Sequence, residues 1–196
     1  MTAPDFDSRL QPLVAVSLAA LADALAPVPD QRWNEPSMCE GWAVRHVIAH
    51  LTMAARHDEA AFTAELTANG FDFQTTSDRI ALRDGELPPE ALLADLRGET
   101  MASFPQPGGG FAGSLSHVVI HGLDATQPLG LERSCSDEAA RTVLDSLVAT
   151  TPNVFGVDTS GLAIRATDLD WSYGTGQLVD RSAAELLLAL SGRAID

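Results

Sequence analysis

Apolar side chains recur at helical spacing through most of the first 150 residues of this chain. In residues 6–26 they occupy one face of an expected helix. These positions are Leu10, Leu13, Val14, Leu18, Leu21 and Leu25. Further helices are expected at residues 43–69, 88–103, 114–127 and 136–150, separated by segments that contain proline or glycine. The periodicity predicts a mainly α-helical protein built on a four-helix bundle.

The pattern changes toward the C-terminal end of the chain. The runs GLAIRAT and LDWSY alternate like short strands, and SAAELLLALSGR is typical of a closing helix. We therefore expect two parts, a helical bundle over residues 1–152 and a small α/β domain over residues 153–196.

Composition and charge narrow the class of protein. The net charge is −15 and none of the 12 basic residues is a lysine, so no basic patch is expected to bind nucleic acid. No apolar run is long enough to span a bilayer, and the first residues lack the pattern of a secretory signal. The two cysteines form neither a CxxC motif nor a disulfide framework. The sequence thus predicts a cytoplasmic protein without a membrane or nucleic-acid partner.

The histidines are the strongest indication of chemistry. All five fall in two short windows, with His46, His50 and His57 in the first and His117 and His121 in the second. Histidines four residues apart lie on one face of a helix, one turn apart. Two facing helices could then supply three imidazole nitrogens to one divalent metal ion and leave positions open for water or substrate. We predict His50, His117 and His121 as the ligands, with His46 and His57 as neighbours.

Two alternatives stay open at this point. A helical histidine is often a surface or core residue whose hydrogen bonds are satisfied, without any metal. Asp124, three residues after His121, could orient the imidazole from outside the ligand set, or it could cap the end of the helix.

One long segment, RWNEPSMCEGWAVRHVIAHL, resembles the signature of the mycothiol-dependent maleylpyruvate isomerase family. The matching residues are Trp33, Pro36, Ser37, Cys39, Gly41, Trp42, Val44, Ala49, His50 and Leu51. The N-terminal domain of that family is a DinB-like metal-binding four-helix bundle. The resemblance places the family's metal-binding histidine at His50, and it places His46 where an acid is usual.

A second motif of that family is similar to SLSHVVIHGLD. His121 and Asp124 match it, whereas His117 stands where the isomerases have Glu, and Ser114 where they have Arg. Three histidines form a neutral ligand set, so the bound ion should be a stronger Lewis acid than with a carboxylate ligand. The end of the chain resembles a shortened form of the family's small C-terminal domain. The matches there are Thr167, Asp168, Trp171, Gly192 and Arg193.

The resemblance implies a metal-dependent enzyme that uses a low-molecular-weight thiol such as mycothiol. The expected reaction is S-transfer to, or cis–trans isomerisation of, a small electrophile, with Zn²⁺ as the expected ion and Ni²⁺ or Fe²⁺ as alternatives. We expect residues 71–89 to form an irregular loop with a short helical turn. Arg79 and Arg83 in this loop are candidates for steering an acidic substrate. Alternatively, they are solvated loop residues.

Two other functions fit the same residues. In a metal-dependent hydrolase the ion would activate water, and His46 or His57 would serve as the general base. In a binding protein the bundle would hold a ligand or metal without turnover. A homodimer is compatible with each of the three.

Overall fold

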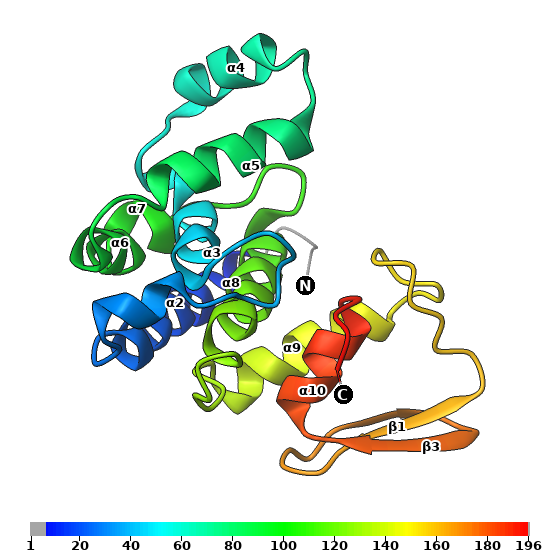
Figure 1. Ribbon diagram of the computed structural model, residues 1–196. Coiled ribbons are helices and arrows are strands. Elements are labelled where there is room, and N and C mark those ends of the chain that lie inside the picture. The colour runs from blue at the N-terminus through cyan, green and yellow to red at the C-terminus, as the bar shows by residue number, and fades with distance from the viewer. Residues whose placement is uncertain (1–6, 196) are drawn as a thin grey trace. The chain divides into compact units, whose positions relative to one another are not determined.

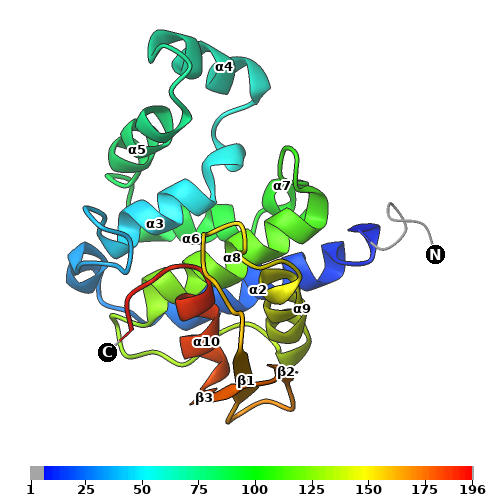
Figure 2. The same ribbon diagram turned by 90° about the vertical axis from the view of Figure 1, so that its right-hand side faces the viewer.

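The computed structural model describes residues 7–195 of the chain. It is mainly helical with one small three-stranded sheet near the C-terminus, which confirms the predicted class (Figures 1 and 2). The chain divides into two compact units, with the boundary between Ser134 and Cys135. Each unit is described by itself.

Four helices form the bundle of the first unit. They are α2 (Gln11–Leu25), α3 (Val44–Leu51), α6 (Pro89–Leu96) and α8 (Gly110–Thr126). Both α2 and α3 pack against α8, and both also contact α6, so the four helices enclose one core. Its fully buried side chains include Leu21, Leu25, Ile48, Leu92, Leu115 and Leu123. Two short helices, η1 (Asp30–Asn34) and α7 (Glu99–Ala102), pack on α3 and α2 respectively.

The single helix expected over residues 43–69 is wrong. The chain leaves α3 at Leu51, makes the short helix η2 (Met53–Ala55) and begins a new helix, α4 (Glu59–Ala68). The break has a local cause, because the Asp58 side chain accepts a hydrogen bond from the N–H of Ala61 and so caps the new helix. His57 therefore lies outside the helix that carries His46 and His50.

The irregular loop expected over residues 71–89 is also wrong. Most of it forms α5 (Phe73–Asp84), which Asp72 caps by accepting from the N–H of Thr75. The helix packs on α3 through a face that includes Thr76 and Ser77, so apolar periodicity did not reveal it. In Figure 1, α4 and α5 lie side by side as a hairpin above α3.

The second unit contains α9 (Asp137–Val148), the strands β1 (Leu162–Ala166), β2 (Ser172–Gly174) and β3 (Gln177–Arg181), and α10 (Ala183–Leu190). Strand β1 lies in the centre, antiparallel to β2 and parallel to β3 (Figure 2). Helix α9 packs against α10, so it belongs to this unit although we expected it in the bundle. The division into domains at residue 152 stays a prediction.

Candidate metal centre

Three histidines from two bundle helices lie together. Helix α3 carries His50, and α8 carries His117 and His121 one turn apart. The Nε2 atoms of His50 and His117 are 2.9 Å apart. The ring centroids of the three residues are 4.7 to 4.9 Å from one another, and one nitrogen of each ring lies within 4.8 Å of the others. The structure thus brings together the three residues that the sequence singled out, while their role as ligands stays a prediction.

Burial keeps the imidazoles of His50 and His117 neutral. Burial, and then the nearby His121, lower the pKa of His50 from 6.5 to about 3. Burial, and then the neighbouring His121 and His50, also lower the pKa of His117 well below its ordinary value. A neutral imidazole has a free lone pair on one nitrogen and is the form that binds metal ions. The donor set therefore fits a divalent ion such as Zn²⁺.

Asp124 holds the ring of His121. Its carboxylate is completely buried, and one oxygen, Oδ2, lies 2.9 Å from His121 Nδ1. The thiol of Cys39 donates to the same oxygen over 3.2 Å, and the N–H of Met38 donates to the backbone carbonyl of Asp124. An ionised carboxylate only accepts hydrogen bonds, so Asp124 favours the tautomer of His121 that has its proton on Nδ1 and leaves Nε2 as the nitrogen available to a ligand.

His50 has a contact that the sequence did not predict. Ser77 of α5 places its hydroxyl oxygen 3.0 Å from His50 Nδ1, and the indole of Trp42 lies with its centroid 5.0 Å from the imidazole. Ser77 was missed because its segment was expected to be a loop. The signal was present in Asp72, a typical N-cap residue, followed by residues at positions 76, 77, 80 and 81 that share one buried face.

His46 has a local structural contact instead. Its Nδ1 accepts a hydrogen bond from the N–H of Ala43 at the start of α3. The ring also packs against Gly85, where an added Cβ would lie 2.3 Å from His46 Cδ2. His46 is not part of the histidine group found among the described residues, and its catalytic role stays a prediction.

Arg79 and Arg83 lie on α5 and bind the neighbouring helix of the hairpin. Arg79 donates to the side-chain oxygen of Asn69 over 2.6 Å. Arg83 donates to Glu65 over 2.6 Å and to Asp84 over 3.0 Å. These contacts explain the two arginines as structural residues, so their proposed steering of a substrate stays a prediction.

A separate charged cluster contains His57. Asp84 accepts from Arg56 over 2.9 Å and lies 2.7 Å from His57 Nε2, and Arg56 also pairs with Asp95. Burial raises the pKa of Asp84, but the hydrogen bonds from Arg56, His57 and Arg83 outweigh it and leave the pKa below its ordinary value. His57 thus pairs with a carboxylate instead of joining the other histidines.

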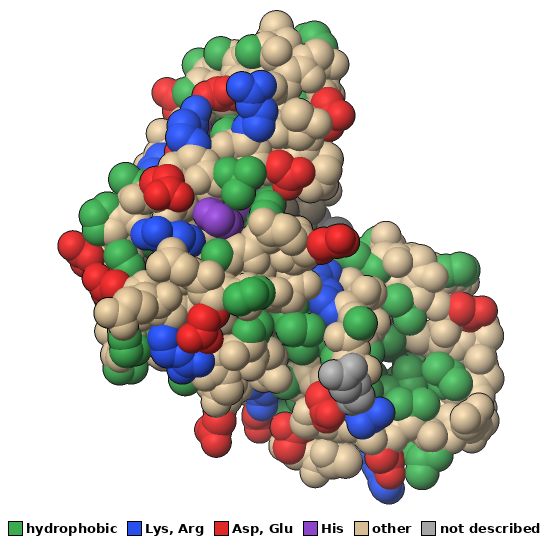
Figure 3. Space-filling view, viewed as in Figure 1, with side chains coloured by type: hydrophobic (Ala, Val, Ile, Leu, Met, Phe, Trp, Pro, Cys, Tyr) green, Lys and Arg blue, Asp and Glu red, His purple; other side chains and the backbone are tan. Residues whose placement is uncertain are grey.

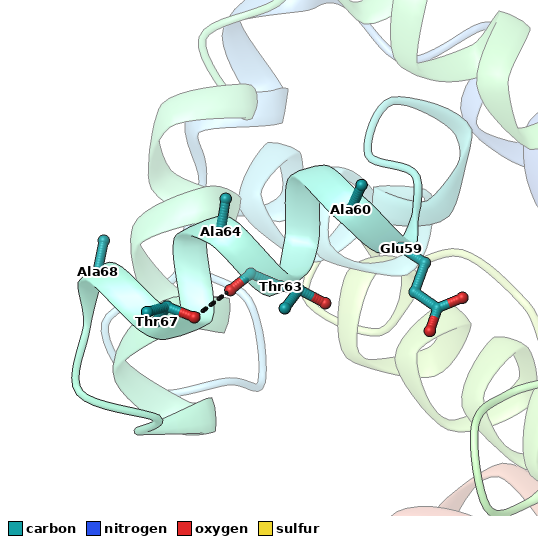
Figure 4. A pocket seen from close by; sticks show the side chains of 6 residues that line it. All are labelled: Glu59, Ala60, Thr63, Ala64, Thr67 and Ala68. Carbon is teal, nitrogen blue, oxygen red and sulfur yellow. Dashed lines mark hydrogen bonds between the residues drawn. The ribbon is translucent and has the colours of Figure 1, made fainter.

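The surface recess on α4 has no comparable chemistry. Figure 4 shows its six lining residues, all from this one helix. They are Glu59, Ala60, Thr63, Ala64, Thr67 and Ala68. The hydroxyl of Thr67 is already bonded to the backbone carbonyl of Thr63. On the face shown in Figure 3, arginines are mixed with acidic side chains and form no continuous basic patch.

One protein family resembles the first half of the chain. Residues 14–103 match a family model described as the mycothiol maleylpyruvate isomerase N-terminal domain. The resemblance predicted from the sequence is confirmed. The matched segment contains His50, Cys39 and Ser77, and it ends before His117 and His121. No helix of the described residues is both long and apolar enough to cross a membrane.

Two solved structures share the fold of this chain. The chain resembles the crystal structure of the mycothiol-dependent maleylpyruvate isomerase, with a TM-score of 0.59 and 19% identity, covering 100% of this chain and 94% of that one. A mutant of that isomerase gives the same TM-score at 18% identity, covering 99% and 93%. This likeness confirms the DinB-like fold.

The similar curated sequences are longer. Uncharacterized proteins from two strains of Mycobacterium tuberculosis are each 29% identical over 136 residues, covering 57% of this chain and 53% of theirs. The chain therefore spans about half the length of the curated relatives it matches.

Proposed function

We propose that His50, His117 and His121 hold a divalent metal ion, with Zn²⁺ expected, and that the protein uses it with a low-molecular-weight thiol of the mycothiol type. The proposed reaction is S-transfer to, or isomerisation of, a small electrophile. The observation that carries the proposal is the group of three histidines, each of which has one ring nitrogen within 4.8 Å of those of the other two. The match of residues 14–103 supports the choice of thiol chemistry.

The residues of the chain have distinct parts in this proposal. A bound divalent ion would supply the Lewis acidity that lowers the pKa of a thiol, so that the nucleophilic thiolate exists at neutral pH. His50, His117 and His121 bring no charge to the ion, which preserves that acidity. Asp124 fixes the ring and the tautomer of His121. Cys39 occupies a second hydrogen-bonding site on the same carboxylate and helps to hold it in place.

The hydrolase alternative has less support. It requires a general base beside the metal, and the two candidates for that base have other partners. His46 binds the start of its own helix, and His57 pairs with Asp84. A binding protein without turnover remains the alternative that the experiment must separate from the enzyme.

The first test is the metal content of the purified protein. We expect about one divalent ion per chain in the wild type. A His117→Ala and His121→Ala double variant should lose the ion while it keeps its helical circular dichroism. His46→Asn is the matched control, because asparagine preserves an acceptor for the N–H of Ala43, and this variant should retain the ion. A wild type that contains no metal and also refuses added Zn²⁺ and Ni²⁺ would contradict the proposal.

The second test separates the three functions. The metal-loaded protein is incubated with small electrophiles, with and without a low-molecular-weight thiol, and products are followed by mass spectrometry. Product that requires both the metal and the thiol supports the transferase or isomerase. Product that requires the metal alone indicates a hydrolase, and saturable binding without product indicates a binding protein.

A further inference from the structure

Both ring nitrogens of His50 face a defined partner. Nε2 lies 2.9 Å from His117 Nε2, inside the histidine group. Nδ1 lies 3.0 Å from the hydroxyl oxygen of Ser77, which belongs to a different helix, α5. The Ser77 side chain is buried, with the residue only 2% exposed. Its position is therefore set by the packing of α5 on α3.

We propose that Ser77 is a positioning residue that orients His50 for metal binding. The inference rests on the proposed function and adds to it a residue outside the ligand set. In this arrangement His50 binds the ion through Nε2, so its one proton must be on Nδ1. That N–H then donates to the Ser77 oxygen, which fixes both the tautomer and the rotation of the ring.

A hydroxyl is suited to this position because it can both donate and accept. Without an ion, two imidazole nitrogens 2.9 Å apart form a hydrogen bond only when one proton lies between them, on either His50 or His117. If that proton is on His50 Nε2, Nδ1 is bare and Ser77 donates to it. With an ion held by His50 Nε2, the proton of the neutral imidazole would be on Nδ1, and the Ser77 oxygen would be its acceptor.

The contrast with His121 supports this assignment. An ionised Asp124 can only accept from His121 Nδ1, so it favours one tautomer of that ring. Ser77 gives His50 a partner in either tautomer. The histidines of α3 and α8 thus have different kinds of hydrogen-bonding partner. His121 is fixed from its own helix, and His50 is supported by the α4–α5 hairpin through Ser77.

The test measures Zn²⁺ affinity by competition with a chromogenic chelator. Ser77→Ala removes the partner of Nδ1 and should weaken affinity by about 10-fold to 100-fold. Ser77→Thr keeps the hydroxyl and should restore affinity to within about threefold of the wild type. Ser17→Ala is the matched control, because Ser17 is another bundle serine that is 2% exposed, and its affinity should equal that of the wild type.

A second measurement distinguishes a lost orientation of the His50 ring from a general destabilisation of the fold. In zinc-loaded wild type and Ser77→Thr, nitrogen-15 NMR should detect a slowly exchanging proton on Nδ1 of His50. In Ser77→Ala that signal should disappear through exchange with water, while the melting temperature of the metal-free protein stays close to that of Ser17→Ala. If the wild type binds no zinc, both the proposed function and this inference fail. If the wild type binds zinc and Ser77→Ala binds it equally well with the Nδ1 proton still present, only this inference is overturned.

Discussion

Replacing Asp124 with alanine tests how the completely buried carboxylate beside His121 supports the histidine group. The carboxylate oxygen that accepts from His121 Nδ1 at 2.9 Å also accepts from Cys39 Sγ at 3.2 Å. Asp124→Ala leaves two donors without this acceptor, and each unsatisfied buried group costs about 1–3 kcal/mol. Water can reach His121, whose side chain is 16% exposed, so the lower part of the range applies. We expect the metal-free variant to lose about 2–3 kcal/mol of unfolding free energy.

The stabilisation of the folded state by bound zinc gives a second, independent measure of the effect of Asp124→Ala. At a free zinc concentration 100 times the wild-type dissociation constant, binding adds about 2.7 kcal/mol to the stability of the folded state. Loss of the carboxylate behind a histidine ligand weakens metal affinity by about 10-fold to 100-fold. At the 100-fold limit and the same zinc concentration, the Asp124→Ala variant would gain only about 0.4 kcal/mol. The difference exceeds the error of a careful urea titration.

The assay is urea unfolding followed by far-ultraviolet circular dichroism, with chelator and with buffered zinc. Asp23→Ala serves as the control, because this aspartate on α2 has a side chain that is 75% exposed and pairs with a surface arginine. The control should match the wild type in both conditions. An Asp124→Ala variant that still gained about 2.7 kcal/mol from zinc would show that the carboxylate does not prepare His121 for an ion.

Three further predictions concern neighbouring groups. Asp84→Asn should lower stability by about 2 kcal/mol, because it removes the charged acceptor that Arg56 and His57 share and leaves Arg56 with Asp95 alone as its anionic partner, and an unchanged urea midpoint would contradict this. The pKa of His50 is about 3 in the metal-free folded state and 6.5 ordinarily, so between these pH values the folded state binds fewer protons than the unfolded state. The melting temperature should therefore fall as the pH drops from 6.5 toward 3, and a melting temperature that does not change with pH would contradict this. Cys39→Ser should keep zinc affinity within about threefold, since the hydroxyl can replace the thiol as donor to Asp124, whereas a 10-fold loss would assign the sulfur a further role.

The parts of the site that could be predicted are local in the sequence. His117 and His121 are four residues apart and Asp124 is three further on, so one helix places them together regardless of the rest of the fold. Their meeting with His50 depends on α3 packing against α8, which spacing alone does not establish. The resemblance of the RWNEPSMCEGWAVRHVIAHL segment to a known family supplied that step.

The end of α3 and the start of α4 were not predicted, because side chains that bind the backbone determine both. Thr52 donates its hydroxyl to the carbonyl of Ile48 at the end of α3, and Asp58 caps α4 six residues later. Helical periodicity carries no information about such a break, because the apolar pattern continues on both sides of it. His57 was consequently expected as a neighbour of the three ligands, whereas it pairs with Asp84.

The polar residues of α5 explain two things. They are the reason why the helix was not predicted, and they are the reason why it can contact the site. Hydrophobic periodicity identifies a helix by the apolar residues that it buries. Helix α5 buries Thr76 and Ser77 as well as Ile80 and Ala81, so its buried face reads as polar. That face is polar where it meets His50, whose Nδ1 needs a hydrogen-bonding partner that an apolar side chain cannot supply. A buried polar face on a helix is unfavourable for folding unless each of its groups is paired, and such departures from the local rules are expected at functional sites. The helix that apolar periodicity did not reveal is therefore the one that places Ser77 beside His50.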